Sequence, residues 1–247
     1  MTRHALVTGA AAGIGRATAA ALAEAGWRLT LLDRDATGLD TAARRLREAG
    51  ASVDVAPVDL VDAAATRAAV AEAAARAPLA AIVNSAALFP QRPFADATAE
   101  EFDEILATNV RAPFVLAKAA VDFMPAGGAL VLLTSISARM DKADHPYMRM
   151  LAMYHASKAA LDRWVAGTAA DLAGAGIVTS TLCSGAFVAT EGTARVDTTL
   201  APPFASIDAA TVGRAVAWLA ANPRPDHVAA RFTATTFGTD WGAAPAR

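Results

Sequence analysis

The sequence has little cysteine, little lysine and no long apolar run. Cys183 is the one cysteine among 247 residues. This excludes an intrachain disulfide and a cysteine-rich zinc site, and it makes a reducing cytoplasm the expected compartment. The four histidines are scattered without the spacing of metal ligands, so no metal site is expected. No apolar run approaches the roughly 18 residues that cross a bilayer, and the first residues turn too soon for a signal peptide.

Charge is also scarce. Charged residues make up 19% of the chain and the net charge is −2, so there is no basic excess of the kind that binds nucleic acid or an anionic membrane surface. Hydrophobic residues make up 55%, which excludes intrinsic disorder and allows a large buried core. Only three lysines and two tyrosines are present. A lysine or tyrosine that falls on a motif is therefore less easily explained by chance.

Short apolar runs alternate with longer alanine-rich stretches. Several of the runs are apolar throughout, which is typical of strands buried on both faces of a parallel sheet. Repeated strand–helix–strand units predict one α/β domain over residues 1–247, a doubly wound parallel sheet of about seven strands with helices on both faces. The predicted strands are residues 5–7, 28–32, 52–55, 80–83, 129–133, 178–182 and 232–236. The predicted helices are residues 14–24, 36–49, 63–75, 99–121, 152–172 and 208–221.

Two stretches fit this alternation poorly. Residues 138–153 carry charges, a proline and most of the methionines, and residues 188–206 carry threonines and a pair of prolines. Long loops in a compact domain are often functional. We expect both to be loops that form a mobile lid over a substrate, and neither to join a sheet.

A glycine-rich segment, TGAAAGIG at residues 8–15, joins the first strand to the first helix. Glycines allow a tight turn and close approach of a ligand, and the helix N-terminus offers free N–H groups to a phosphate. A plain strand–helix turn is the alternative. Asp33 ends the second strand, where a carboxylate accepts hydrogen bonds from the ribose hydroxyls of an adenosine and repels a 2′-phosphate.

The residues around Asp33 leave its role open. It could be a helix N-cap or a solvated turn residue, or Asp35 could cap the following helix and leave Asp33 for the ribose. Arg34 could pair with a 2′-phosphate, whereas Ala12 supplies no basic group in the glycine loop. These residues favour NAD over NADP, with NADP as the alternative.

Tyr154 and Lys158 lie four residues apart in a predicted helix, so both side chains can reach one site. A nearby ammonium favours the phenolate and is expected to lower the pKa of the tyrosine. Tyr147 has Leu151 at the equivalent spacing and cannot form the same pair. Ser135 follows the fifth predicted strand, where its hydroxyl could hold a substrate oxygen.

Taken in order, these motifs resemble the short-chain dehydrogenase/reductase family over essentially the whole chain. The resemblance rests on TGxxxGIG at residues 8–15, Asn109 in a helix, Ser135, and YxxxK at Tyr154 and Lys158. It implies a Rossmann-like fold with Tyr154 as general acid/base and Lys158 on the nicotinamide ribose. It further implies that Ser135 contacts the reacting oxygen and that Asn109 holds a relay water. It implies cofactor contacts at Gly9, Ala12, Gly13, Ile14, Gly15, Asp33, Arg34, Asp59, Leu60, Asn84, Ser85, Ala86, Tyr154, Lys158, Gly185, Val188 and Thr190.

The sequence departs from the family pattern at Ala87 and Ser184, where a glycine and a proline are usual, and the span between Ser135 and Tyr154 is longer. The implied activity is hydride transfer between NAD(H) and a secondary alcohol or ketone. The alternatives are a non-redox nucleotide sensor on the same fold and an epimerase or dehydratase with bound NAD. The resemblance also implies a homodimer or homotetramer through residues 99–121 and 152–172. An apolar substrate wall is expected from Leu88, Phe89, Met150, Met153, Ala186 and Phe187.

Overall fold

The computed structural model describes residues 2–139, 146–195 and 205–242. Its centre is a seven-stranded sheet of order β3-β2-β1-β4-β5-β6-β9, in which all neighbours pair in parallel. This confirms the doubly wound Rossmann-like fold. The strands are β1 His4–Thr8, β2 Arg28–Asp33, β3 Val53–Pro57, β4 Leu79–Asn84, β5 Gly128–Leu133, β6 Ile177–Cys183 and β9 Arg231–Thr233.

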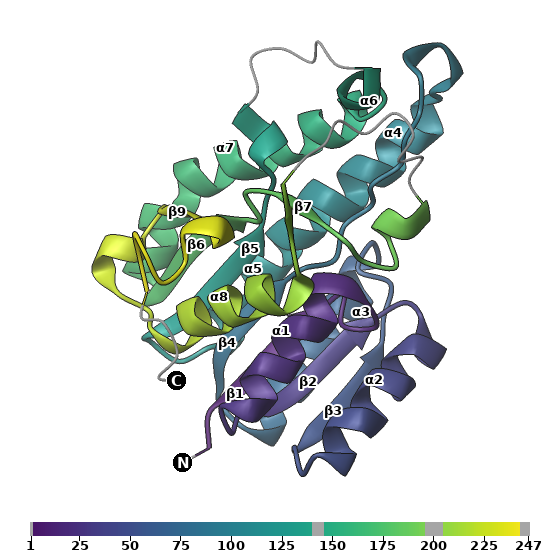
Figure 1. Cartoon of the computed structure of the whole chain (residues 1–247). Helices are drawn as coiled ribbons and strands as arrows, with labels where there is room; N and C mark the ends of the chain where they lie inside the picture. The colour runs from purple at the N-terminus through teal and green to yellow at the C-terminus, as the bar shows by residue number, and fades with distance from the viewer. Residues whose placement is uncertain (1, 140–145, 196–204, 243–247) are drawn as a thin grey trace.

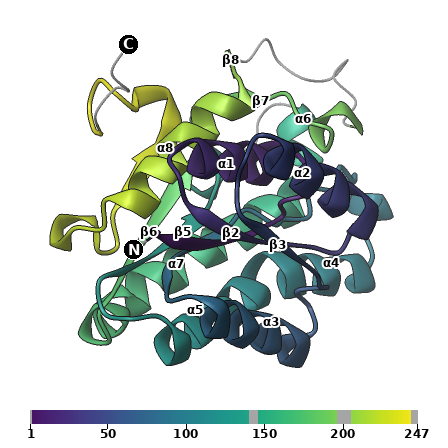
Figure 2. The same ribbon diagram turned by 90° about the horizontal axis from the view of Figure 1, so that it is seen from below.

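Helices cover both faces of the sheet, as Figures 1 and 2 show. One face carries α1 Gly13–Glu24, α2 Ala36–Glu48 and α8 Ala209–Ala221. The other carries α3 Ala63–Arg76, α4 Ala99–Leu106, α5 Ala112–Phe123 and α7 Ala152–Gly174. In the described chain, no helix combines the length and hydropathy that crossing a bilayer requires.

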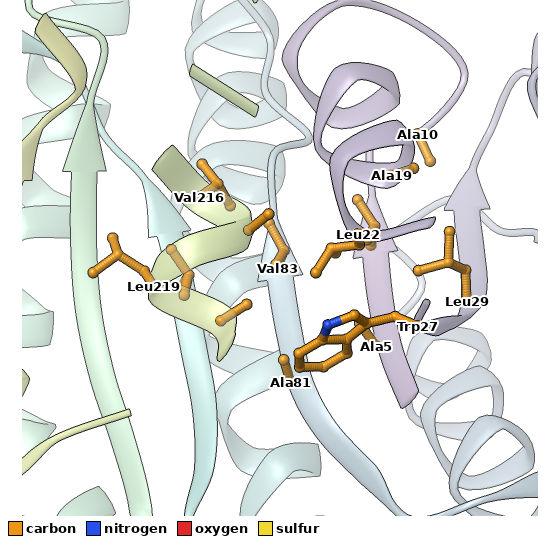
Figure 3. Close-up of a cluster of buried hydrophobic side chains, with 14 of the residues drawn as sticks. Ala5, Ala10, Ala19, Leu22, Trp27, Leu29, Ala81, Val83, Val216 and Leu219 are labelled. Atoms are coloured by element: carbon orange, nitrogen blue, oxygen red, sulfur yellow. The ribbon is translucent and has the colours of Figure 1, made fainter. Parts of the chain in front are cut away.

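The core has two layers because alternate residues of each strand face opposite sides of the sheet. In β1, Ala5 and Val7 belong to the apolar cluster under α1 and α8, and Leu6 belongs to the cluster on the other side. Figure 3 shows the first cluster, in which Leu22 of α1 and Val216 of α8 lie over the sheet. Burial of each large side chain contributes about 1.5–3 kcal/mol, so both layers fix the strand order that builds the site.

The helix predicted over residues 99–121 is interrupted. A capping box between Thr98 and Glu101 starts α4, and a π-helical turn, Ala107–Arg111, separates it from α5. Pro113 lies in the first turn of α5 and has no N–H to donate to the carbonyl four residues earlier, that of Asn109. The backbone hydrogen bonds of the helix span one more residue at this point, and such π-turns often occur at functional sites. Asn109, within this turn, is fully buried.

Three further predictions need correction. The strand predicted over residues 232–236 is only β9, because the chain turns into a short 3₁₀ helix at Ala234–Thr236. The segment expected to avoid any sheet forms one: β7 Phe187–Val188 pairs with β8 Ser206–Ile207. The other predicted loop contains the 3₁₀ turn Ile136–Arg139 and helix α6 Pro146–Arg149. The remainder of the two predicted lids, residues 140–145 and 196–204, lies outside the described residues.

Candidate active site

A cavity of about 490 Å³ opens at the carboxyl ends of the strands, where the strand order reverses between β1 and β4. Ligands of open α/β sheets bind at such a switch point. The cavity runs from the glycine loop to the start of α7. The predicted site residues that line it are Gly9, Ala12, Gly13, Ile14, Asp33, Arg34, Asp59, Leu60, Ser85, Ala86, Ser135, Tyr154, Lys158, Gly185, Val188 and Thr190. Gly15, Asn84 and Asn109 do not line it and support the wall from behind.

The glycine loop needs glycine because the backbone passes very close to itself and to the residues that follow β4. A Cβ on Gly9, whose φ is +66°, would lie 2.7 Å from the amide nitrogen of Ala86. A Cβ on Gly15 would lie 2.1 Å from the carbonyl oxygen of Gly9. Thr8 fixes the same junction, since its hydroxyl donates to Oδ1 of Asn84 at 2.8 Å. The loop is thus a bare backbone cradle at the N-terminus of α1.

A carboxylate already lies at this helix N-terminus. The amide of Gly13 donates to Oε2 of Glu191 at 3.1 Å, and Arg16 pairs with the same carboxylate. Helix N-termini attract anions through free N–H groups and the helix dipole. The pKa of Glu191 is lowered first by a hydrogen bond from its own backbone amide and then by the contacts with Arg16 and Gly13. Glu191 escaped the sequence analysis because nothing in its local sequence indicates that it reaches α1.

Asp33 lines the cavity and is not used as a helix cap. Its Oδ2 accepts a hydrogen bond from the amide of Ala11 at 3.0 Å, and its Oδ1 accepts one from the amide of Asp35 at 3.0 Å. Asp35 itself caps α2 by accepting from the amide of Gly38, as predicted. Arg34 is 60% exposed and lies 3.8 Å from Glu104. Asp59, after β3, accepts from the amide of Val61.

Ser135, Tyr154 and Lys158 meet at the other end of the cavity. Lys158 is buried, and its Nζ donates to the carbonyl of Leu133 at 2.8 Å while lying 5.7 Å from the centre of the Tyr154 ring. Ser135 hydrogen-bonds to Tyr154 and lies 2.7 Å from the hydroxyl oxygen of Ser137. Ser137 was not predicted; its spacing of two from Ser135 is the available signal. The arrangement presents a phenol, two hydroxyls and an ammonium to one space.

Burial dominates the titration of this group. It raises the pKa of Tyr154 to about 12, although the hydrogen bond from Ser135 opposes the rise. It also lowers the pKa of Lys158 to about 8, with the charge of Asp162 opposing the fall. The expected lowering of the Tyr154 pKa by Lys158 is therefore not found. The same low-dielectric surroundings that disfavour the phenolate also disfavour the ammonium that was to stabilise it.

Asn109 holds two segments together. Its Oδ1 accepts from the amide of Leu88 at 2.7 Å, and its Nδ2 donates to the carbonyl of Leu88 and to the hydroxyl of Ser157, each at 2.9 Å. The hydroxyl of Ser157 in turn donates to the carbonyl of Tyr154. The π-turn thus fixes both the cavity wall after β4 and the first turn of α7.

The substrate end of the cavity is mostly apolar. Its wall includes Leu88, Phe89, Ile136, Met148, Leu151, Ala186 and Phe187. Phe89 packs edge-to-face on Tyr154, with ring centres 4.6 Å apart. Met150 and Met153, predicted for this wall, do not line the cavity. Met148 of α6 and Leu151, the N-cap residue of α7, line it instead.

Comparisons with known proteins find similar dehydrogenases and reductases. The chain is 38% identical over 194 residues to galactitol 2-dehydrogenase (L-tagatose-forming) of Cereibacter sphaeroides, covering 78% of this chain and 74% of the relative. It is 36% identical over 160 residues to D-erythrulose reductase of Gallus gallus, covering 65% of this chain and 61% of that protein. A short chain dehydrogenase of Burkholderia cenocepacia, solved in complex with NADP, superposes with a TM-score of 0.81 at 28% identity, covering 94% and 95% of the two chains.

The residues of the cavity fit a nicotinamide dinucleotide. A Cβ at Gly9 would collide with the backbone of Ala86, and Asp33 lines the cavity at the end of β2. The profile of the short chain dehydrogenase family matches residues 3–201. The chain therefore belongs to the short-chain dehydrogenase/reductase family and is an NAD(P)-dependent oxidoreductase that acts on a secondary alcohol or the corresponding ketone.

Proposed function

We propose that this oxidoreductase works through Tyr154, Lys158, Ser135 and Asn109. The observation that carries the proposal is the meeting of Ser135, Tyr154 and Lys158 at one end of the cavity that begins at the glycine loop. A bound nicotinamide supplies or accepts the hydride. The protein contributes orientation of the reacting carbon and a proton at the reacting oxygen.

The proton belongs to the Tyr154 hydroxyl. A pKa of about 12 keeps this phenol protonated at neutral pH, so it is ready to donate to a carbonyl oxygen during reduction. Ser135 hydrogen-bonds to the phenol and can hold the same substrate oxygen. Lys158 lies under the ring and can reach a ribose hydroxyl. Asn109 keeps the first turn of α7 in place, and its water-holding role stays a prediction.

Absorbance of NADH with a panel of ketones and alcohols tests the activity, and tight cofactor binding without turnover would favour a sensor.

We also propose that NAD(H) is preferred. The Asp33 carboxylate is held by two backbone amides at the cavity wall, and position 12 is alanine. A fixed negative charge repels a 2′-phosphate, while Arg34 is turned toward Glu104. Comparison of kcat/KM for NADH and NADPH tests this preference. A higher value with NADPH would contradict it.

The substrate we propose is uncharged, with one polar end and an apolar body. Among the described residues of the substrate end, the two serines and two tyrosines offer hydroxyls and His155 an imidazole, while the ammonium of Lys158 is assigned above to the cofactor ribose. Nε2 of His155 is buried and has no hydrogen-bond partner in the described chain, and burial lowers the pKa of this imidazole. It is thus available to a substrate hydroxyl or carbonyl. The relatives are named for galactitol and D-erythrulose, which also carry no charge.

Matched substrates separate the possibilities. Galactitol, a simple 2-alkanol and 1-phenylethanol differ in the balance of hydroxyls and apolar surface, and gluconate adds a carboxylate. We expect the two apolar alcohols to give the highest kcat/KM and gluconate the lowest. A clear preference for galactitol would contradict the proposed apolar body and show that the substrate is a polyol.

Assembly and location are proposed as well. Phe114 of α5 is 48% exposed and Val121 is 38% exposed, and Phe114 lies 6.1 Å from the ring of Trp164 of α7. An apolar surface over these two helices suits a homodimer or homotetramer, which light scattering will reveal as a multiple of the chain mass. The free thiol of Cys183 is buried, which suits the cytoplasm; cell fractionation tests this.

A further inference from the structure

Two charged side chains that take no part in the proposed chemistry lie buried directly behind it. Asp162 belongs to α7 and Arg231 to β9, and their side chains are only 12% and 15% exposed. Nε of Arg231 lies 3.0 Å from Oδ2 of Asp162. Nη2 of Arg231 also donates to the backbone carbonyl of Ser135, with a nitrogen–oxygen distance of 2.5 Å. One guanidinium thus contacts both the helix and the residue after β5.

The position of this pair in the fold connects it to the residues of the site. Arg231 pairs with Thr181 of β6, so its side chain reaches past β6 to the end of β5, where Ser135 lies. Asp162 lies one helical turn beyond Lys158, on the same face of α7. The pair therefore joins the edge strand, the proposed serine and the helix that carries the proposed tyrosine and lysine.

Stability alone is a weak reason for such a pair. A buried ion pair is often no better than apolar residues of similar volume, because desolvation offsets the attraction. The charges have a second effect here, since Asp162 opposes the fall in the Lys158 pKa that burial causes. The other ionisable groups of the described chain near Asp162 and Lys158 are Tyr154, Cys183 and Arg139, whose Nε is 3.9 Å from Asp162.

We propose that Asp162 and Arg231 are positioning residues of this active site. Arg231 fixes Ser135 through its carbonyl oxygen, and Asp162 keeps a negative charge one turn from Lys158 while holding Arg231 in place. The inference rests on the proposed roles of Ser135, Tyr154 and Lys158. It adds a contact through which the edge strand β9 holds Ser135 in position.

The first test separates kcat from cofactor binding. We expect Asp162→Asn and Arg231→Met each to lower kcat by about 10- to 100-fold, because small displacements of reacting groups have effects of this size. The Kd for NADH should change little, since the glycine loop and Asp33 are untouched. The exposed pair Arg67–Asp122 on the α3–α5 side is the matched control, and Asp122→Asn should leave kcat unchanged.

The second test reads the charge of Lys158 without turnover. Acetylation at a series of pH values, followed by peptide mass spectrometry, gives the pH midpoint at which each lysine becomes reactive. Asp162→Asn should move the Lys158 midpoint to lower pH, because a neighbouring negative charge is lost. Arg231→Met should move it to higher pH, because a positive charge is lost and Asp162 keeps only its longer contact with Arg139. Lys118, exposed on α5, is the internal reference and should not move.

A folding control completes the design. Breaking one partner of a buried pair is destabilising, whereas replacing both by apolar residues is tolerated. Asp162→Leu combined with Arg231→Met should therefore keep the unfolding midpoint near that of the wild type and still lose kcat. Normal kcat in this double variant, or a Lys158 midpoint that stays fixed in both single variants, would overturn the inference. A wild type without turnover but with both midpoint shifts would instead remove the proposed function and keep the electrostatic link.

Discussion

The Glu191 carboxylate accepts a hydrogen bond from the backbone amide of Gly13, at the first residue of α1. A dinucleotide in the cavity needs the same helix N-terminus for its pyrophosphate. Two anions compete for one N–H group, so the loop that carries Glu191 must release α1 when the cofactor enters. We therefore expect the glutamate to weaken cofactor binding.

Glu191→Gln keeps the size of the side chain and removes its charge. We predict that the Kd for NADH falls by about two- to five-fold, the range that corresponds to the usual energy of a charge at a helix N-terminus. Fluorescence titration of NADH measures it. Glu24→Gln, at the exposed C-terminal end of α1, should have no effect. Weaker NADH binding in Glu191→Gln would mean that the carboxylate assists the ligand.

Tyr154→Phe removes one oxygen from the proposed proton donor. We predict a fall in kcat of ~10²–10⁴, the usual contribution of general acid–base catalysis, with the Kd for NADH within a few-fold of the wild type. Tyr147→Phe is the matched control, because it removes the same oxygen from a buried cavity residue that is not the proposed proton donor; its kcat should be nearly unchanged, and any effect should fall on KM. A Tyr154→Phe enzyme that keeps more than about a tenth of kcat, below the usual effect, would exclude Tyr154 as the acid/base.

The two reaction directions should respond differently to pH. Burial raises the pKa of Tyr154, so the free enzyme holds the protonated phenol over the neutral range. Reduction needs the protonated form and should be nearly independent of pH there. Oxidation needs the deprotonated form, so kcat/KM for alcohol oxidation should rise steadily with pH. An oxidation profile that is flat from neutral to alkaline pH would show that another group takes the proton.

Asp33→Asn tests cofactor choice with little change in shape. The amide oxygen can still accept one of the two backbone hydrogen bonds, from Ala11 or Asp35, but the charge that repels a 2′-phosphate is gone. We predict that the ratio of kcat/KM for NADH over NADPH falls by about ten-fold, equivalent to about 1.4 kcal/mol. An unchanged ratio would show that residues other than Asp33 set the preference between NADH and NADPH.

His4 predicts a loss of stability in mild acid. The ring is fully buried at the start of β1, where Nδ1 donates to the carbonyl of Ala77 at 3.0 Å and Nε2 lies 2.9 Å from the hydroxyl oxygen of Thr30. Burial lowers the pKa of His4 below that of the unfolded chain. The stabilisation is therefore present above about pH 6.5 and is lost as the pH falls toward the folded-state pKa.

Urea unfolding at several pH values measures this effect. His4→Asn should be less stable at neutral pH and should lose less of its free energy of unfolding on acidification than the wild type does. His155 and His227, whose pKa values burial also lowers, add to the loss of stability in mild acid. Parallel pH profiles for the wild type and His4→Asn would assign the whole loss to other groups.

Local patterns predicted the fold well, and most of the residues predicted for the cofactor line the cavity. Strands apolar on both faces indicate a parallel sheet, and the TGAAAGIG segment lies between a strand and a helix as expected. The cap at Asp35 was also predictable, because N-capping depends on a few adjacent residues. By contrast, the contacts of Glu191 with Gly13 and of Arg231 with Ser135 join segments far apart in the chain. The periodicity of helices and strands in the sequence does not indicate contacts of this kind.

The pKa of Tyr154 was unpredictable for a related reason. The sequence shows that a lysine lies one turn away, but not that both side chains are buried, and here burial is the larger effect. The π-turn at Ala107–Arg111 left one trace in Pro113, yet a proline in a helical pattern indicates a kink without specifying its geometry.

Because β9 is the last strand of the sheet in the chain, it is synthesised after the residues of the proposed site. Ser135, Tyr154 and Lys158 leave the ribosome well before Arg231, because β9 follows every other strand of the sheet. A nascent chain can therefore form the glycine loop and the first six strands while the carbonyl of Ser135 still lacks its guanidinium. Under the arrangement proposed above, full turnover begins only when the last strand docks at the edge.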